Sequence, residues 1–232
     1  MNTTAEAFSQ RNDFGNFDSN VLFIERTGVL ARESRILEIG SGKGRLLNHL
    51  FRRGYDIRGV EVNRSSIAAS RELYGELPLS AVDAVSLPEP DSSLDIVLSF
   101  DVFEHIPDTD SHLREVMRVL KPGGCYLLQT PNKWTNALFE TIRWKSLTAW
   151  KTEHCSLHSY WQLKRRFAKH GCTVEFYEIP LVTDFFRSKV EAYLGKFGLL
   201  LVKVVNPDAL PLFLRTNYYL KATKSGSAVA PG

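Results

Sequence analysis

The stretch that decides the fold of this chain reads Arg35-Ile36-Leu37-Glu38-Ile39-Gly40-Ser41-Gly42-Lys43-Gly44-Arg45-Leu46-Leu47. Its first half is a hydrophobic run typical of a buried strand, and its last residues begin the apolar spacing of a helix. Glycines at 40, 42 and 44 join the two halves. Because glycine has no Cβ, such a turn lets the backbone approach a bound ligand closely. The stretch therefore predicts a ligand-binding loop between a strand and a helix.

The spacing of the glycines indicates which ligand the loop binds. A dinucleotide fingerprint needs its third glycine one residue later, where this chain has Arg45. An acidic residue, Glu38, lies two residues before the first glycine. The pattern Glu-x-Gly-x-Gly-x-Gly resembles the first motif of the class I S-adenosylmethionine-dependent methyltransferases, whose loop wraps the amino-acid end of the cofactor. The resemblance implies a methionine pocket shaped by Glu38, Gly40, Ser41, Gly42 and Gly44.

Strand-like and helix-like segments alternate along the rest of the chain. The expected strands are 36–39, 57–62, 79–85, 94–100, 126–129, 173–179 and 218–223, and the expected helices are 43–53, 65–74, 110–120 and 159–171. Apolar strands separated by helices predict a parallel α/β sheet covered on both faces. The resemblance adds a Rossmann-like, doubly wound sheet with a late antiparallel strand. Lys121-Pro122-Gly123-Gly124 predicts the end of the third helix, and residues 132–158 are expected to be irregular.

Three parts are expected along the chain. Residues 1–34 form a helical N-terminal lid segment, in which Phe14 and Phe17 close over the cofactor. Residues 35–224 form the methyltransferase domain, with a helical insertion at about 183–215 before the last strand. Residues 225–232 are expected to be a disordered tail.

Further cofactor contacts are expected at the carboxyl ends of strands, where open α/β sheets bind ligands. Glu61, followed by Val62, ends the second strand, and its carboxylate can accept hydrogen bonds from both ribose hydroxyls. Asp83 and Ala84 end the third strand, where the resemblance implies contacts with adenine. At Phe100, the end of the fourth strand, it implies backbone carbonyls facing the ligand's amino-acid end. The expected cofactor is S-adenosylmethionine, with S-adenosylhomocysteine as the product.

A candidate catalytic base follows the fourth strand, in Asp101-Val102-Phe103-Glu104-His105. This segment resembles the Glu-His signature of type-11 and ubiquinone-type O-methyltransferases, which implies that His105 lies near the methyl group. A sulfonium leaves readily, so the enzyme mainly aligns the nucleophile and removes its proton. Histidine titrates near neutral pH and suits that task for a hydroxyl. His105 is therefore the first catalytic candidate and His154 the second, while a packing role for His105 is the alternative.

The same segment supports a metal hypothesis. In small-RNA 3′-terminal methyltransferases, a Glu-x-x-Glu-His segment and a later histidine bind a divalent ion. Asp101, Glu104 and His105 are similar to that segment, and His154 or His158 would be the later histidine. Carboxylates and imidazoles together can hold an ion that polarises a hydroxyl. Because Asp101 is shorter than the glutamate it replaces, no metal ligand is assigned from the sequence.

Composition limits the partners. The net charge is +3, from 29 basic and 26 acidic side chains, which gives no indication of a nucleic-acid partner. The cysteines (Cys125, Cys155 and Cys172) have no metal spacing and fit a reducing compartment. The first residues lack the basic and apolar regions of a signal peptide, so a cytoplasmic protein is expected. The oligomeric state stays open.

The segment 193–214 is apolar with basic residues at its edges. Such a segment can lie in a membrane interface, so peripheral contact with the inner membrane surface is one expectation. A helical cover for the sheet, or a contact between two copies, is the other.

The sequence predicts S-adenosylmethionine-dependent methyl transfer to a small-molecule acceptor, at oxygen, with lipid-linked and aromatic acceptors both open. A nicotinamide-dependent oxidoreductase is disfavoured by Arg45 and Glu38. A non-catalytic domain that binds S-adenosylmethionine is one alternative. RNA methylation is another, and the weak net charge argues against it.

Overall fold

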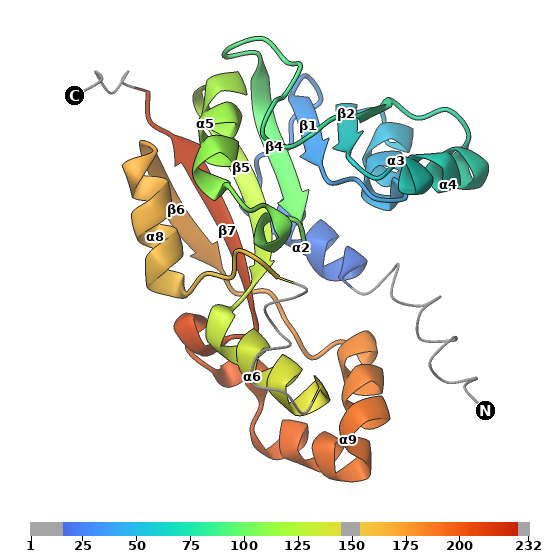
Figure 1. Cartoon of the computed structure of the whole chain (residues 1–232), viewed down its shortest axis with the longest axis vertical. Helices are drawn as coiled ribbons and strands as arrows, with labels where there is room; N and C mark the ends of the chain where they lie inside the picture. The colour runs from blue at the N-terminus through green and yellow to red at the C-terminus, as the bar shows by residue number, and fades with distance from the viewer. Residues whose placement is uncertain (1–15, 145–153, 227–232) are drawn as a thin grey trace.

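In the computed structural model, residues 16–144 and 154–226 are described. Within these residues seven strands form one sheet, in the order β3-β2-β1-β4-β5-β7-β6 (Figure 1). The strands are β1 (Arg35–Ile39), β2 (Asp56–Glu61), β3 (Leu79–Ala81), β4 (Leu94–Phe100), β5 (Leu120–Pro131), β6 (Cys172–Tyr177) and β7 (Asn217–Lys224). Neighbouring strands pair in parallel except at β7, which is antiparallel to both β5 and β6. The expected late antiparallel strand is thus present.

Helices cover both faces of this sheet. These helices are α2 (Phe17–Thr27), α3 (Arg45–Arg52), α4 (Arg64–Tyr74), α5 (Thr109–Val119) and α8 (Tyr160–Lys169). Two further helices, α6 (Lys133–Trp144) and α9 (Asp184–Val204), lie at one end of the sheet (Figure 1). Side chains alternate along β4, as the two-residue period of a strand requires. Ile96 and Leu98 join the core beneath α2 and α3, whereas Val97 joins the core beneath α5 and α8. This burial on two faces confirms the predicted doubly wound fold.

The expected end of the third strand is wrong. The sequence predicts a strand over 79–85, but β3 ends at Ala81. β3 lies at the edge of the sheet and pairs only with β2, whose last residue, Glu61, is opposite Ala81. With no partner beyond Glu61, the chain leaves the sheet, and Asp83 lies in the loop that follows.

The expected start of the fifth strand is also wrong. β5 begins at Leu120, directly after α5, and pairs there with Leu94 before the register shifts. Gly123 has a φ of +79° inside this irregular stretch. A lysine of β7 stabilises the end of α5, because the Lys224 ammonium donates hydrogen bonds of 2.6 Å to the carbonyls of Met117 and Leu120.

Residues 132–158 are not irregular throughout, because α6 occupies their first half. The buried side chain of Asn132 positions the start of this helix. It accepts a hydrogen bond from the Trp134 amide, at 3.0 Å, and donates to two carbonyls in the segment 213–215. Local sequence patterns do not contain these long-range contacts, so they do not predict the helix.

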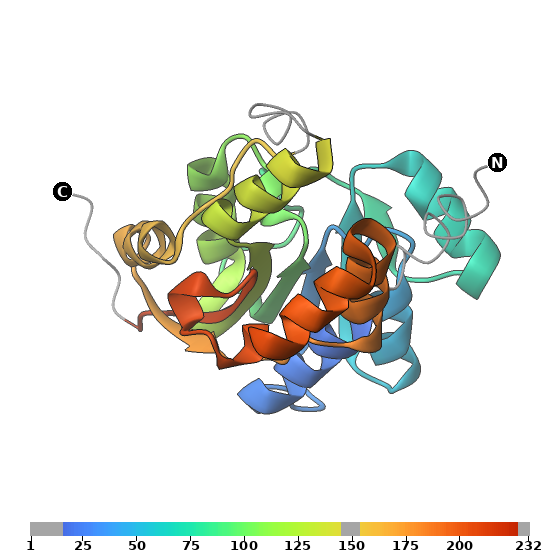
Figure 2. The same ribbon diagram turned by 90° about the horizontal axis from the view of Figure 1, so that it is seen from below.

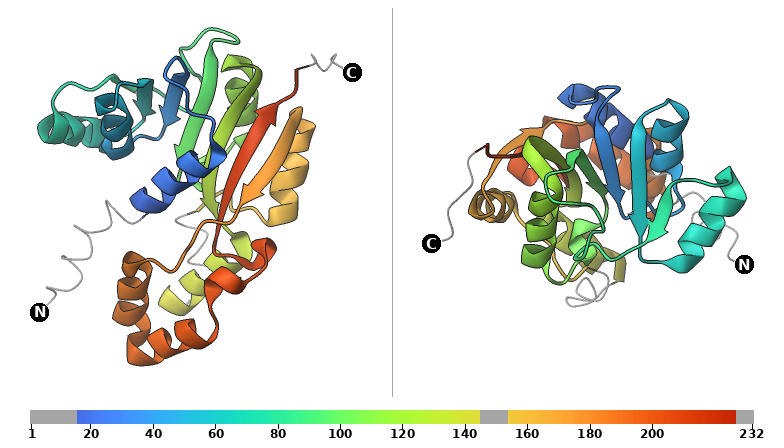
Figure 3. Two further views of the ribbon diagram at one scale, coloured as in Figure 1. Left: turned by 180° about the vertical axis from the view of Figure 1, so that it is seen from behind. Right: turned by 90° about the horizontal axis from the view of Figure 1, so that it is seen from above.

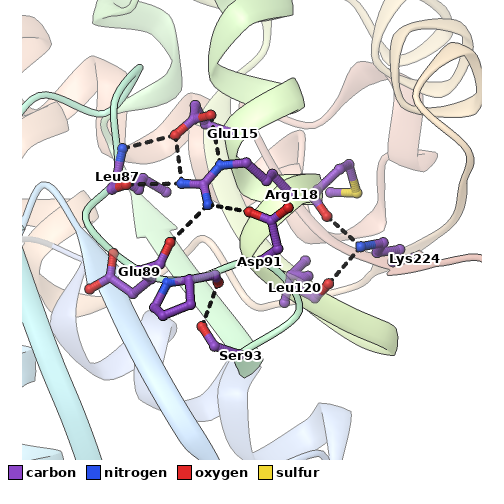
Figure 4. A network of polar contacts seen from close by, with 10 residues as sticks. Leu87, Glu89, Asp91, Ser93, Glu115, Arg118, Leu120 and Lys224 are labelled. Atoms are coloured by element: carbon purple, nitrogen blue, oxygen red, sulfur yellow. Dashed lines mark hydrogen bonds and ion pairs between the residues drawn. The ribbon is translucent and has the colours of Figure 1, made fainter.

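An arginine ties the loop after β3 to α5 (Figure 4). The Arg118 guanidinium donates hydrogen bonds to the backbone carbonyls of Leu87, at 2.9 Å, and Glu89, at 2.8 Å. It also pairs with the carboxylates of Asp91, at 2.7 Å, and Glu115, at 2.9 Å. Because one planar cation contacts both the loop and the helix, it holds the loop against α5.

The residues expected as an insertion contain α9 and two short 3-10 helices, η2 (Pro207–Ala209) and η3 (Leu212–Leu214). Figures 1 and 3 show α6 and α9 at the end of the sheet where the parallel strands finish, and Figure 2 shows α9 from below. None of the described helices has both the length and the apolarity needed to cross a bilayer. The exact domain boundaries stay a prediction.

Two expectations fall partly outside the described residues. The lid prediction depends on residues 1–15, which include Phe14, and the tail prediction depends on 227–232. The described part of the N-terminal segment, α2, is packed on the sheet through the buried side chains of Phe23 and Ile24. A lid role for the residues before α2 stays a prediction.

Candidate cofactor and catalytic site

The glycine loop turns tightly after β1. The backbone amides of Gly40 and Ser41 both donate to the carbonyl of Val60, at 2.8 and 3.1 Å. All three glycines have positive φ, of +71° at Gly40, +52° at Gly42 and +79° at Gly44. Side chains rarely adopt this conformation, so the positions require glycine on backbone grounds alone.

The space around the loop differs between its glycines. A Cβ on Gly40 would lie 2.2 Å from a methyl carbon of Val102, and one on Gly44 would lie 2.5 Å from the Ser70 hydroxyl. At Gly42 a Cβ would meet nothing within 4 Å. Gly40 and Gly44 therefore permit close packing, whereas Gly42 borders open space into which a ligand can fit.

Glu61 ends β2 beside this open space. Its carboxylate accepts hydrogen bonds from the Gly42 amide, at 2.9 Å, and from the Asn63 amide, at 2.8 Å. The Asn63 side chain in turn caps α4 by accepting from the amides of Ser65 and Ser66. The carboxylate is thus held in place at the edge of the glycine loop.

Glu38 is buried in β1 beneath the loop. Its Oε2 atom has no hydrogen-bond partner among the described residues. Burial is the main cause that raises the pKa of Glu38 to about 7, and Ser41 partly offsets it by a hydrogen bond. A buried carboxylate oxygen without a partner is costly, so this atom is suited to a cationic or hydrogen-bonding ligand group.

The loop that carries Asp83 and Ala84 is held by a histidine that the sequence analysis did not identify. His112 of α5 is fully buried, with Nδ1 2.9 Å from the Ala84 carbonyl and Nε2 2.9 Å from the Tyr126 hydroxyl. Burial lowers the pKa of His112 to about 4, so the ring is neutral. The Asp83 side chain is exposed and accepts a hydrogen bond from the Val85 amide.

The chain turns sharply after Phe100. Asp101 has a φ of +55°, unusual for a residue other than glycine. Its amide donates to the side-chain oxygen of Gln129, at 2.8 Å, and its carboxylate accepts from the Asn16 amide group, also at 2.8 Å. Gln129 is fully buried at the end of β5, and a buried amide on an apolar strand is the signal that would have identified it.

A short 3-10 helix, η1 (Phe103–His105), presents the candidate base. The His105 side chain is exposed, and its ring centroid lies 5.1 Å from that of His154. Glu104 is buried and accepts a hydrogen bond from the Thr130 hydroxyl at 3.0 Å. Burial, reinforced by the charge of Asp101, raises the pKa of Glu104.

Backbone contacts bring the second histidine to this helix. The Ser156 amide donates to the Glu104 carbonyl at 2.9 Å, which holds the segment around His154 against η1. As a result, ligand atoms of Glu104, His105 and His154 all lie within 4.8 Å of one another. This group joins residues from two distant parts of the chain.

The other proposed ligands do not belong to this group of three. Asp101 is turned towards Asn16, to which its carboxylate is hydrogen-bonded. His158 is buried with its ring centroid 5.3 Å from that of Phe103, and burial lowers its pKa to about 4. The structure thus brings His154, and not His158, to the candidate base.

The strand order, the antiparallel β7 and the glycine loop after β1 define a class I methyltransferase fold. Among solved structures, a putative sarcosine dimethylglycine methyltransferase from Galdieria sulphuraria has this fold. Its TM-score is 0.66 at 19% identity, over 91% of this chain and 87% of that one.

Residues 37–128 match the family model described as a methyltransferase domain. A probable S-adenosylmethionine-dependent methyltransferase of Mycolicibacterium smegmatis is 35% identical over 103 residues, which are 43% of this chain and 39% of that protein. A ubiquinone biosynthesis O-methyltransferase of Paramagnetospirillum magneticum is 37% identical over 106 residues, 44% of this chain and 42% of that protein. The chain spans about two-fifths of the length of the curated relatives it matches.

Residues 37–128 therefore match a methyltransferase domain, and the relatives over this region are class I S-adenosylmethionine-dependent methyltransferases. This family consists of transferases whose methyl donor is S-adenosylmethionine. The resemblance inferred from the glycine loop is confirmed, and so is the expected cofactor.

Proposed function

We propose that the protein transfers the methyl group of S-adenosylmethionine to an oxygen atom of a small-molecule acceptor. The observation that carries the proposal is the pairing of His105 with His154 next to the glycine loop. Val102, three residues before His105, is the residue that a Cβ on Gly40 would strike. The candidate base thus lies close to the loop that is expected to bind the cofactor. The name of the O-methyltransferase relative supports oxygen as the acceptor atom.

The described residues fit the cofactor. The partnerless Oε2 of Glu38 suits the cationic amino-acid end, and the open space beside Gly42 leaves room for the ligand. The Glu61 carboxylate keeps lone pairs for ribose hydroxyls, because each oxygen accepts only one amide hydrogen bond. Asp83 and Ala84 are available to contact adenine. The remaining residues expected to line the cofactor site are Ser41, Val62 and Phe100. When bound, the cofactor supplies an electrophilic methyl group on a good leaving group.

His105 performs the proton transfer in this proposal. The bound cofactor would supply the methyl group and leave as S-adenosylhomocysteine, and the imidazole of His105 would accept the proton of the acceptor hydroxyl. Because His105 is exposed, the proton then passes to solvent. His154, whose ring lies 5.1 Å away, orients His105 or takes the proton in its place.

The test uses S-adenosylmethionine with a labelled methyl group, incubated with the protein and a host extract that is then separated into lipid, small-molecule, RNA and protein fractions. Label is expected in the lipid or small-molecule fraction. The His105→Gln variant is expected to lose about 100-fold in kcat with unchanged cofactor affinity. His170→Gln, at a histidine bound to Asp110 and outside the catalytic group, is the matched control. Label in RNA alone, or cofactor binding without any label, would contradict the proposal.

The same group of residues supports a second candidate, a divalent metal site. Glu104, His105 and His154 would hold the ion, since their ligand atoms lie within 4.8 Å of one another. One carboxylate and two imidazoles suit Zn²⁺, Mn²⁺ or Fe²⁺. Such an ion would polarise the acceptor hydroxyl, which would make a separate base unnecessary.

A chelator distinguishes the divalent metal site from the His105 base, because only the metal site depends on a bound ion. If a metal is required, treatment with EDTA abolishes transfer, one divalent ion restores it, and Glu104→Gln lowers the bound metal measured by mass spectrometry. If His105 acts as a base, EDTA has no effect on transfer.

A further inference from the structure

The second half of α9 exposes apolar side chains to solvent. α9 bends at Gly195, where φ is +60° and ψ is −159°, and continues from Lys196. Beyond the bend, Phe197 is 76% exposed, Leu200 57%, Leu201 49% and Val204 74%. Their spacing of three, four and seven residues places them on one face of the helix. We name these four residues the apolar stripe.

The stripe points away from the protein. Gly198 is buried, and Leu199 and Val202 are half-buried, so the opposite face of the helix is turned inward. A helix of a water-exposed surface normally turns its apolar face to the core. A contiguous exposed apolar patch instead marks an interaction site. Neighbouring apolar residues are exposed as well: Leu194, Val205, Phe213 and Leu214.

Positive charge accompanies the stripe. Lys196 and Lys203 are both exposed and are two helical turns apart, so they lie on the same side of the helix. The sequence has no aspartate or glutamate between Glu191 and Asp208. An apolar face bordered only by cations complements a surface with an apolar interior and anionic headgroups.

We propose that the second half of α9 is a peripheral anchor that lies in the interface of a membrane containing anionic lipids. The apolar stripe enters the acyl boundary, and Lys196 and Lys203 contact lipid phosphates. No described helix can cross a bilayer, so the anchor lies in the membrane surface. A second copy of this chain is a poorer partner, because facing stripes would bring the lysines of both copies together.

The position of α9 determines how the candidate site would be oriented at a membrane. α9 lies beyond the carboxyl ends of the parallel strands, the end of the sheet where the glycine loop and η1 also lie (Figures 1 and 3). Docking through α9 would therefore turn the candidate site towards the lipid, where a lipid-linked acceptor resides. Membrane binding itself does not rest on the proposed function, because it requires no catalysis.

Vesicle flotation with the full chain tests the proposal. Wild-type protein is expected to float with vesicles of phosphatidylcholine and phosphatidylglycerol, and less with phosphatidylcholine alone or in high salt. The double variant Phe197→Asp/Val204→Asp is expected to bind at least about tenfold more weakly. The double variant Lys196→Glu/Lys203→Glu is expected to lose the preference for anionic lipid. Leu73→Asp, at an exposed leucine of α4, is the matched control and should bind as wild type does.

Circular dichroism and cofactor binding establish that each variant is folded. Equal binding by wild type and Phe197→Asp/Val204→Asp, or no flotation with any vesicle, would overturn the proposal. Sedimentation velocity tests the alternative that a second copy of the chain covers the apolar stripe. A dimer that Phe197→Asp/Val204→Asp converts to a monomer, without vesicle binding by wild type, would assign the apolar stripe to contact between copies.

Discussion

The carboxylate of Glu61 accepts a hydrogen bond from the backbone amide of Gly42 at 2.9 Å, across a sequence separation of 19 residues. This bond joins the end of β2 to the glycine loop after β1. The Glu61 carboxylate therefore has two roles, because it shapes the loop and leaves oxygen lone pairs for a ligand.

Glu61→Gln should weaken binding of S-adenosylmethionine. The amide has one acceptor oxygen without charge, so the bonds from Gly42 and Asn63 cannot both be kept at full strength. We expect the Kd, measured by isothermal titration calorimetry, to rise about tenfold or more, which corresponds to about 1.4 kcal/mol. Glu72→Gln, at an exposed position of α4, should leave the Kd unchanged, and equal Kd values for both variants would refute the role of Glu61.

Alanine should be tolerated differently at two glycines of the loop. At Gly42 it meets open space, so only the positive φ of +52° costs stability, about 1–2 kcal/mol. At Gly40 the same backbone strain is joined by a contact of 2.2 Å with Val102. We expect Gly40→Ala to lose about 1–3 kcal/mol more than Gly42→Ala in urea unfolding. A larger loss of unfolding free energy for Gly42→Ala than for Gly40→Ala would show that Gly42, and not Gly40, is the tightly packed position.

Glu38 should make stability depend on pH. Its pKa in the folded protein is about 7, above the ordinary value of 4.5, so the folded state holds the proton more tightly. This contribution is present at low pH and is lost as pH rises from about 4.5 to about 7. Relative to Glu38→Gln, the wild type should lose on the order of 2–3 kcal/mol of unfolding free energy between pH 5 and pH 8.

Other titrating groups change stability with pH in the opposite direction, and the comparison with Glu38→Gln cancels their contributions because both proteins contain them. His112, whose pKa is lowered to about 4, destabilises the protein as pH falls from about 6.5 towards 4 in both proteins. Parallel stability curves for wild type and Glu38→Gln would mean that Glu38 is not buried as a proton-holding carboxyl.

Arg118→Ala should destabilise the fold. Arg118 donates to the carbonyls of Leu87 and Glu89 and pairs with two carboxylates. Because the guanidinium is only partly exposed, we expect a loss of about 2 kcal/mol in chemical unfolding. Arg114→Ala on the same helix removes one exposed hydrogen bond to Ser111 and should cost less than about 0.5 kcal/mol. Similar losses for the two variants would contradict the importance of the Arg118 contacts.

Local patterns were sufficient for most of the sheet. The apolar runs at β1 and β4 predict strands because each is buried on both faces, and the glycines at 40, 42 and 44 predict the loop because each needs a positive φ. The end of β3 could not be predicted in this way, since it depends on the length of its only neighbour, β2. The start of α6 depends on Asn132 contacting a segment about eighty residues later.

The sequence alone determined the type of protein. It predicts an α/β chain with a glycine loop whose backbone can approach a ligand closely, and histidines suited to proton transfer or metal binding. The sequence left His154 and His158 both open as the later metal-binding histidine. The tertiary structure decided that His154 accompanies His105, because contacts such as the Ser156–Glu104 hydrogen bond hold its segment against η1. It also decided that the apolar stripe of α9 faces outward. Spacing along the chain fixes the face of a helix that residues share, but only packing fixes where that face points.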